Sequence, residues 1–296
     1  MDILINVLEQ GFLFSLAALG VFITYKILDF PDLTVDGSYP LGACIVAVLL
    51  VKGINPWISV IIATLGGGAA GFATAFLNVK LKISNLMSGI LVMISLYSIN
   101  LLVMGKSNTP LFSTSHLFKK KIRLAGINVR AILIIIAILL IIKILFDIFM
   151  KTKIGFLLNA VGDNERVVTS LGVNKNNIKI IGLMISNGLV SMSGALTAQY
   201  SGLADVGMGS GIVVKGLASV IIGVSIFGSI KLIKPSTAAI FGTTIYYIAI
   251  TIALRLNIDP NLLNLLTAIV IIIALSLQNK ISITDLLKGE KSNAKN

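Results

Sequence analysis

Residues 155–172, GFLLNAVGDNERVVTSLG, form a polar, glycine-bounded segment in a chain that is otherwise almost entirely apolar. Apolar runs of membrane-spanning length flank this segment, at 131–150 and 178–198. A short loop would suffice to join two such runs, but residues 151–177 carry two short pieces with apolar positions at helical spacing. We therefore expect 151–177 to form a docking surface on one membrane face, as a transport pore needs when another subunit supplies its energy.

The composition of the whole chain indicates an integral membrane protein. Of 296 residues, 56% are hydrophobic and only 12% are charged, and the mean hydropathy is +0.99. Long apolar runs of this kind are typical of membrane helices, because lipid leaves no partner for an unpaired backbone group. The apolar segments are 4–28, 41–51, 57–77, 86–104, 131–150, 178–198, 213–230, 237–254 and 262–277. The sequence predicts an all-α, polytopic membrane protein with a single domain, 1–296.

The second apolar segment is too short to cross a hydrocarbon core of about 30 Å as a helix. It follows the stretch PDLTVDGSYPLGA, which contains proline and glycine and two acids and predicts a broken or re-entrant helix. If residues 37–52 do not cross, the chain has eight spans and a cytoplasmic N-terminus. If they cross, it has nine spans and an outer N-terminus. The shortness of the segment favours eight.

Basic residues set the predicted orientation. The basic regions that fall on one side of alternating spans are Lys80 with Lys82, residues 151–179, Lys231 with Lys234, and the tail 280–296. The positive-inside rule makes this side the cytoplasm, although the basic segment 105–130 then lies outside. We expect a multi-pass protein of the cell membrane, with a coupling region at 151–177 and a cytoplasmic tail at 280–296.

Several other functions are disfavoured by the residue types. The net charge of +12 comes from lysines and arginines in loops and tails, so we expect no nucleic-acid partner. Cys44 and His116 are the only cysteine and histidine, which argues against a disulfide and a metal site. The first ten residues lack a basic start and a cleavage site, so the first span is predicted to be retained.

The centres of the apolar spans contain no acid or base, since Lys143 and Asp147 lie near a predicted cytoplasmic end. Ion-coupled carriers usually place an ionisable residue near the midplane, so this pattern argues against proton coupling. The glycines at 66–68 are expected to pack helices, because they lack the Lys-Ser/Thr of a phosphate loop. We expect no catalytic residue and no cofactor on this chain, with ATP bound by a partner.

Two polar regions are candidates for a substrate pathway. In the first, Asp36, Gly37 and Ser38 precede a short helix whose free amides could bind an anionic group. An ordinary capped turn is the alternative. In the second, Asn187, Ser191 and Gln199 share one helical face, and hydrogen bonds between helices without a substrate role are the alternative. We expect Asp36–Ser38, Asn187 and Ser191 to line a central cavity at a dimer axis.

Four motifs give the chain a family resemblance: DLTVDGSYPLGA, AVGDNERVVTSLGV, NGLVSMSGALTAQYSGLADVGMGSG and GLASVIIG. In this order and spacing, over roughly residues 16–277, they resemble the permease subunits of ABC importers, in the branch of the branched-chain amino-acid and ribose permeases. The chain is most similar to the single-permease group associated with tryptophan or related amino acids. The resemblance implies a translocation pathway for a small solute such as an amino acid.

The resemblance also implies three kinds of partner: a cytoplasmic ABC ATPase, an extracytoplasmic binding protein and a second copy of the chain. The residues carried over to the ATPase-coupling region are Ala160, Gly162, Asp163, Asn164 and Gly172. Within it, we expect Asn164 to cap the second short helix and Gly162 to give the turn its freedom. A heterodimer, a stand-alone secondary transporter and a membrane enzyme are the alternatives.

Overall fold

The computed structural model describes residues 2–118, 123–124, 127–128, 130–228, 230, 233–255, 262, 265, 267–269 and 272. Seven helical stretches in this part of the chain are long and apolar enough to cross a membrane. The long helices are α1 (Asp2–Val21), α3 (Pro56–Val79), α4 (Asn85–Met104), α5 (Arg130–Met150), α8 (Lys175–Ser201), α9 (Ile212–Phe227) and α10 (Pro235–Arg255). The predicted all-α membrane fold is confirmed. Most of the predicted segment 262–277 and all of the tail 280–296 lie outside the described residues.

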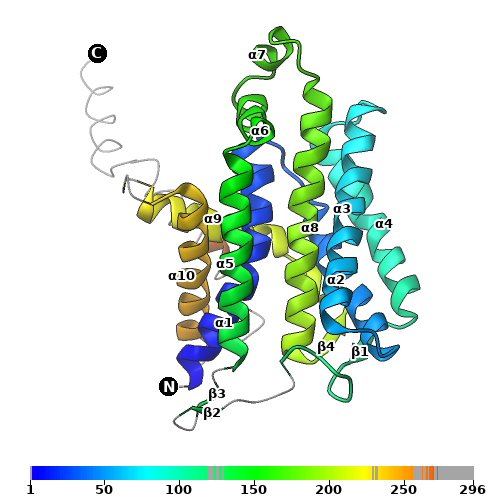
Figure 1. Ribbon diagram of the computed structural model, residues 1–296, viewed down its shortest axis with the longest axis vertical. Helices are drawn as coiled ribbons and strands as arrows, with labels where there is room; N and C mark the ends of the chain where they lie inside the picture. The colour runs from blue at the N-terminus through cyan, green and yellow to red at the C-terminus, as the bar shows by residue number, and fades with distance from the viewer. Residues whose placement is uncertain are drawn as a thin grey trace, which may run out of the picture.

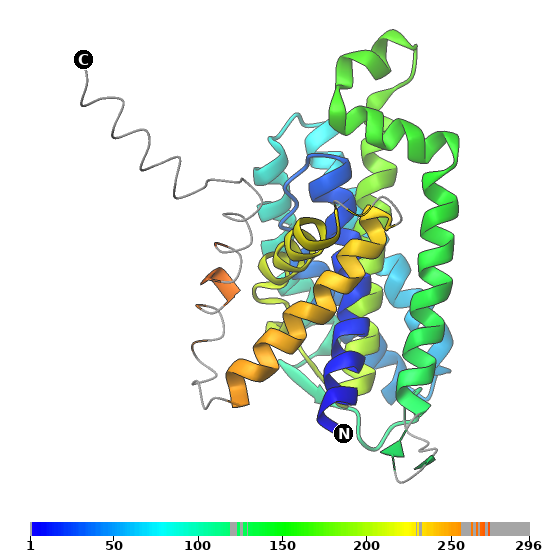
Figure 2. The ribbon, with the colours of Figure 1, turned by 90° about the vertical axis from the view of Figure 1, so that its left-hand side faces the viewer.

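The short elements gather at the two ends of the helical bundle (Figures 1 and 2). At one end lie α6 (Lys153–Asp163) and α7 (Glu165–Ser170), which form the coupling face of the molecule. At the opposite end, β1 (Asn108–Pro110) pairs antiparallel with β4 (Leu203–Asp205). The other elements are β2 (Arg123–Leu124), β3 (Ile127–Asn128), the 3₁₀-helix η2 (Val206–Gly209), the π-helix η1 (Phe22–Ile27) and α2 (Val35–Val51).

The N-terminus lies on the face opposite to the coupling face (Figure 1). Near the start of α1, Glu9 accepts a hydrogen bond of 2.6 Å from the hydroxyl of Tyr200, which is at the far end of α8. At the other end of α1 and η1, the carbonyl of Ile27 lies directly against Gly162 in α6. The α1–η1 stretch therefore runs the whole length of the bundle.

The chain then returns across the bundle through an irregular stretch, 28–34, followed by α2. The start of α2 is level with the middle of α8, where Ser38 donates to Asn187 Oδ1 at 2.7 Å. Residues 28–34 join Ile27, at the coupling face, to the start of α2 at mid-depth, so they supply the length that α2 lacks. The N-terminus and the coupling region therefore lie at opposite faces (Figure 1), which agrees with the alternative in which residues 37–52 complete a crossing and not with the re-entrant one.

α8 is the centre of the bundle, and small residues let its neighbours approach it. A Cβ atom on Gly67 of α3 would lie 2.3 Å from the Cβ of Ser191, and one on Gly71 would lie 2.2 Å from the carbonyl of Leu183. On the α2 side, a Cβ on Gly42 would lie 1.9 Å from the carbonyl of Ser191. The glycines near 66–68 therefore pack helices, as expected from small residues in membrane proteins.

Two carboxylates lie in the middle of the bundle, although the apolar spans predicted from the sequence have no acid at their centres. Asp32 is 5% exposed, and Asp36 contacts the start of α9. The sequence did not show their depth because both acids precede or begin a helix that is broken at mid-depth, so neither lies inside a long apolar run. The absence of an acid near the midplane therefore no longer argues against proton coupling.

Candidate substrate pathway and coupling surface

The two broken crossings of the bundle meet at Asp36. One crossing consists of 28–34 and α2, and the other of 203–211 and α9. The Asp36 carboxylate accepts hydrogen bonds from the backbone N–H of Val213 at 2.7 Å and of Gly211 at 3.2 Å. These amides have no partner within α9, so the acid of one crossing caps the helix of the other. A Cβ on Gly209 would lie 1.9 Å from the carbonyl of Asp36, which shows how closely the backbones approach.

A cavity of about 500 Å³ opens beside this contact, and we call it the pathway cavity. Three elements line it: the start of α2, the middle of α4 and the η2 segment. The lining residues are Asp36, Gly37, Pro40, Met93, Ile94, Tyr97, Ser98, Asn100, Val206, Gly207, Gly209 and Ser210. The cavity combines a polar end near Asp36 with apolar walls, which is the usual composition of a small-molecule site.

The structure separates the predicted pathway residues into two groups. Asp36 and Gly37 line the pathway cavity, whereas Ser38 is fully buried behind them. Asn187, Ser191 and Gln199 are fully buried and do not line it. Their role in a substrate pathway stays a prediction, and their observed contacts are with the protein.

Asn187 is the centre of a buried polar network. Its Oδ1 accepts from Ser38, while its Nδ2 donates to Asp32 Oδ2 at 2.7 Å and to the carbonyl of Leu183 at 3.1 Å. The other Asp32 oxygen accepts the N–H of Thr34 at 2.9 Å. Buried polar groups are costly unless paired, so this network fixes the first crossing against α8.

The other two predicted residues have separate partners. The Ser191 hydroxyl donates to the carbonyl of Ala63 at 2.7 Å and joins α8 to α3. Gln199 Oε1 accepts the N–H of Leu117 at 3.1 Å and holds the segment after β1 against the end of α8. Asn187, Ser191 and Gln199 thus each contact a different segment, and the structure does not bring them together around one space.

Sequence reasoning missed the α4 residues of the pathway cavity, because 86–104 was treated as an ordinary apolar span. The useful signal was Tyr97 and Asn100, two polar-tipped residues one helical turn apart. Asn100 Nδ2 donates to the carbonyl of Gly37 at 3.2 Å, and its Oδ1 has no hydrogen-bond partner among the described residues. Asn100 therefore ties α4 to the start of α2 beside the cavity.

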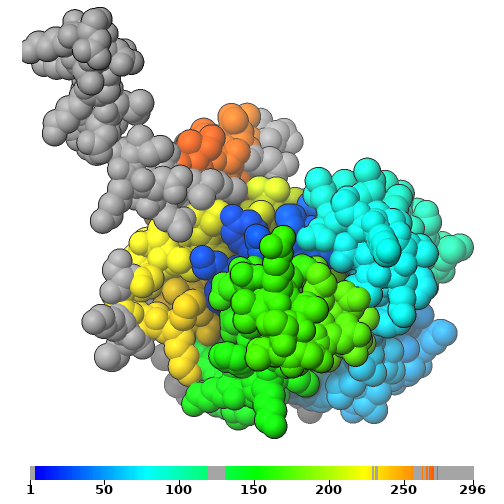
Figure 3. Space-filling model, turned by 90° about the horizontal axis from the view of Figure 1, so that it is seen from above, coloured from blue at the N-terminus to red at the C-terminus, as the bar shows by residue number. Residues whose placement is uncertain are grey.

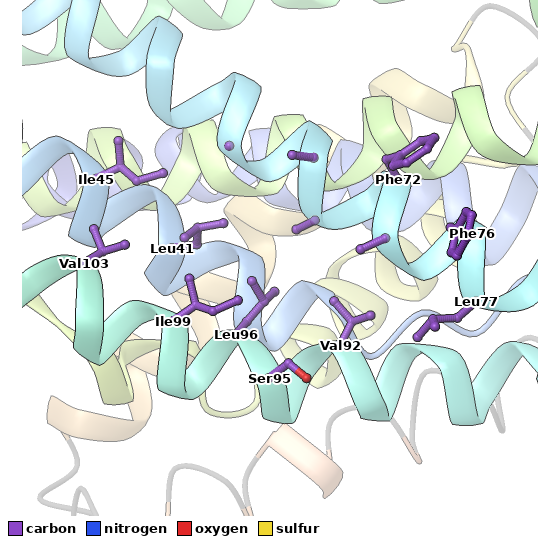
Figure 4. A pocket seen from close by; sticks show the side chains of 14 residues that line it. Leu41, Ile45, Phe72, Phe76, Leu77, Val92, Ser95, Leu96, Ile99 and Val103 are labelled. Atoms are coloured by element: carbon purple, nitrogen blue, oxygen red, sulfur yellow. The ribbon is translucent and has the colours of Figure 1, made fainter.

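A second cavity, of about 750 Å³, lies between α2, α3 and α4 and is almost wholly apolar (Figure 4). Leu41, Phe72 and Leu96 represent its three walls, and Ser95 is the only hydroxyl on its lining. It lacks the polar groups that orient a polar solute, so the pathway cavity is the better candidate for transport. No group of three or more metal-binding side chains occurs in the described part of the chain.

Comparisons with known proteins decide the class of this chain. The model of the family described as "Branched-chain amino acid transport system / permease component" matches residues 3–275. The chain belongs to this family. It is therefore a multi-pass permease subunit of the cell membrane, of the amino-acid type found in ABC importers, and not an enzyme.

Three relatives of the permease align with between 64% and 93% of its length. It is 51% identical to the tyrosine transport system permease protein of Clostridioides difficile (strain R20291), over 93% of this chain and 91% of that protein. It is 36% identical to an uncharacterized protein of Rickettsia prowazekii (strain Madrid E), over 93% and 98%. A probable branched-chain amino acid transport permease, LivH of Methanocaldococcus jannaschii, is 25% identical over 64% and 65%. No solved structure matches the permease.

The α6–α7 region projects from the permease beyond its spans (Figures 1 and 3). As expected, Asn164 caps α7, because its side chain accepts the N–H of Arg166 at 3.0 Å. Gly172 follows α7 with a φ of +73°, a conformation that favours glycine. Glu165 forms ion pairs with Lys175 and Lys179 and so fastens α7 to α8.

The prediction that Gly162 gives a turn its freedom is wrong, because Gly162 lies inside α6. A Cβ atom at this position would lie 1.8 Å from the carbonyl of Ile27, so the glycine allows α6 to approach η1 closely. Ala160 is half-buried against the core on the same helix. Asp163 and Asn164 are exposed at the tip.

Proposed function

We propose that the permease carries an aromatic amino acid of the tyrosine type through the pathway cavity. The observation that carries this proposal is the position of the cavity, where both broken crossings meet and where Asp36 and Asn100 offer polar groups at mid-depth. Its volume of about 500 Å³ suits a single small molecule. The half-exposed ring of Tyr97 and the side chain of Ile94 supply an apolar wall for an aromatic side chain. The relative at 51% identity is named for tyrosine transport.

We further propose that α6 and α7 dock on an ABC ATPase, which binds and hydrolyses the ATP. Large apolar side chains are exposed on these helices outside the spans, where lipid does not explain them. Phe156 is 68% exposed, Val167 is 50% exposed, and Leu171, just after α7, is 63% exposed. Exposed apolar side chains of this kind suit a groove on a partner protein.

In the same proposal, the coupling face is cytoplasmic, and an extracytoplasmic binding protein delivers the solute to the opposite face. Lys26, Lys80, Lys82 and the basic residues of 151–179 all lie at the coupling face, as the positive-inside rule requires. Two copies of the chain form the transporter, because one copy supplies one coupling region. In a Cys44→Ala protein, cysteines at Asn176 and Ser210 should react with an impermeant thiol reagent from opposite sides. Reaction from one side would refute this orientation.

A matched pair of serines on α4 tests the pathway. Ser98 lines the pathway cavity and Ser95 lines the apolar cavity, and both are exposed on the same helix. Ser98→Leu should lower tyrosine uptake about tenfold, equal to about 1.4 kcal/mol, at normal membrane levels. Ser95→Leu should leave it near the wild-type rate. Equal effects of the two changes would refute the pathway, and absence of tyrosine uptake by the wild type would refute the substrate.

The docking proposal has its own test. Phe156→Ser and Leu171→Ser should each reduce copurification of the ATPase and abolish uptake without changing the amount of permease in the membrane. Leu140→Ser is the control, because Leu140 is similarly exposed on α5 but faces the membrane region. Normal ATPase binding in both α6–α7 variants would contradict the proposed docking surface.

A further inference from the structure

A third pocket, of about 260 Å³, lies at the coupling-face end of the bundle and is separate from the pathway cavity. It is formed where η1, the end of α5, α6 and the start of α10 meet. Its lining residues are Phe22, Ile27, Phe146, Asp147, Met150, Lys151, Asn159, Lys234, Pro235 and Ser236. We call it the basic pocket.

The charged groups of the basic pocket leave an excess of positive charge. Asp147 is the acid on its lining, and it accepts from Lys143 at 2.5 Å and from Lys234 at 2.7 Å. The Ser236 hydroxyl also donates to Asp147, at 3.3 Å. Lys151, which directly follows α5, makes no ion pair within the described part of the chain. The lining thus carries two lysines, Lys151 and Lys234, against one carboxylate that also pairs with Lys143, so the pocket favours an anion.

The start of α10 adds to the same preference. Pro235 is the first residue of α10 and lines the pocket, so the positive end of the helix dipole lies beside the lysines. Pro235 has no N–H, and the N–H groups of Thr237 and Ala238 donate to the carbonyl of Lys234, so the helix start contributes through its dipole and not through a set of free amides.

The remaining walls are apolar, which makes an amphiphile a better occupant than a free anion. Phe22 and Phe146 meet edge to face, with ring centroids 6.4 Å apart, below the charged groups. The end of α5 lines the pocket. The preceding part of α5 exposes five large apolar side chains toward the membrane region: Leu140, Ile141, Ile144, Leu145 and Ile148. Because α5 ends at Met150, the lysines lie at the depth where lipid headgroups meet the hydrocarbon region.

We propose that the basic pocket binds the phosphodiester headgroup of an anionic phospholipid, with the acyl chains lying along α5. Lys151 and Lys234 contact the phosphate, and the ion pair with Asp147 holds Lys234 in place. A basic pocket between transmembrane helices is a known way for proteins to hold anionic lipid. Ile27 of η1 and Asn159 of α6 belong to the walls, so the bound lipid supports the contact between the first crossing and the coupling region.

The test measures binding of phosphatidylglycerol to the purified full-length chain by native mass spectrometry, with phosphatidylcholine as the zwitterionic comparison. The wild type should retain phosphatidylglycerol preferentially. Lys151→Gln should weaken this binding about fivefold, and Lys151→Gln with Lys234→Gln about 25-fold. Lys234→Arg keeps the charge and should bind as the wild type does, which separates loss of charge from damage to the Asp147 contact.

Lys52→Gln is the matched control, because Lys52 is exposed at the opposite face and its substitution removes the same charge. Equal weakening by Lys52→Gln and Lys151→Gln would show general attraction to anionic lipid and overturn the proposal. Displacement of the lipid by millimolar inorganic phosphate would also overturn it, because the pocket would then be a site for a free anion. Retention of lipid by the double variant would do the same.

Discussion

The first broken crossing, 28–34 with α2, and the second, 203–211 with α9, have the same plan but different supports. In each, an irregular stretch reaches mid-depth and a helix starts there. The first crossing carries the two acids at mid-depth: Asp32 accepts the N–H of Thr34 at the start of α2, and Asp36 caps α9. The acid of the second crossing, Asp205, instead accepts the N–H of Gly207 in η2 at 2.6 Å, near the opposite face.

This difference indicates that the second crossing depends on the first more than the first depends on the second. The first is fixed to α8 by side-chain hydrogen bonds and contacts the coupling region through Ile27 and Gly162. The second relies on glycines and on a carboxylate supplied by the first. A change in the first crossing should therefore disturb the second, whereas a change in the second should leave the first intact.

The largest expected effect comes from Asn187→Leu, which removes the support of the first crossing. The change leaves Asp32 Oδ2 and the Ser38 hydroxyl buried without this partner, and unpaired buried groups cost about 1–3 kcal/mol each. We expect a loss of about 4 kcal/mol in stability and a low membrane level, measured by thermal unfolding in detergent. Ser191→Ala, which removes one hydrogen bond on α8, should cost about 1 kcal/mol. Normal stability with selective loss of uptake would instead support the sequence-based pathway prediction for Asn187.

Gly209→Ala tests the contact between the crossings and should come next. Its Cβ would lie 1.9 Å from the carbonyl of Asp36, and the backbone cannot yield cheaply, so we expect about 3 kcal/mol of destabilisation. Gly211→Ala, two residues away, meets no atom within 4 Å and is strained only by its φ of +73°, which costs about 1 kcal/mol. Melting temperatures compare the two variants. A larger effect of Gly211→Ala would refute the close approach as the critical feature.

Asp36→Asn should have a smaller effect on stability, confined to the second crossing. One amide oxygen can still accept the N–H of Val213, but the amide nitrogen then faces the N–H of Gly211, and the charge at the start of α9 is lost. We expect a loss of about 1–2 kcal/mol. Cysteine accessibility should rise at Val213 and stay unchanged at Thr34. A rise at both positions would show that the crossings are coupled in both directions.

The smallest expected effect is that of acid on the contact between α7 and α8. Hydrogen bonds from Lys175 and then Lys179 lower the pKa of Glu165 below its usual 4.5. Because the folded pKa is lowered, this stabilisation is complete above pH 4.5 and is lost as the pH falls through the lower folded value. Spin labels at Ser170 and Asn177, in a Cys44→Ala protein, should separate below pH 4.5. Glu165→Gln should show the separation at every pH, and an acid response that persists in this variant would rule out Glu165 as its origin.

Local patterns were predictable from the sequence, and distant pairs were not. The two short helices of 151–177 and the Asn164 cap follow from apolar spacing and a single cap residue, both of which act over one turn. The bond between Asp32 and Asn187 joins residues 155 positions apart, and nothing in either local sequence specifies the other. The crossing by α2 was missed for a related reason, because the length supplied by 28–34 depends on a polar partner in α8. The same holds for Asn100, whose position beside Gly37 depends on how α4 packs.

The 155-residue separation of Asp32 and Asn187 also limits the order in which this protein can be made. While the ribosome is still synthesising the chain, Asp32 has no Asn187 to meet, and a carboxylate costs about 2.5–3.5 kcal/mol at the centre of a helix entering the bilayer. The stretch 28–34 should therefore wait at the membrane surface, or in the translocon, until α8 has been inserted. Truncated nascent chains that end before α8 should expose Asp32 to water, and those that include α8 should not.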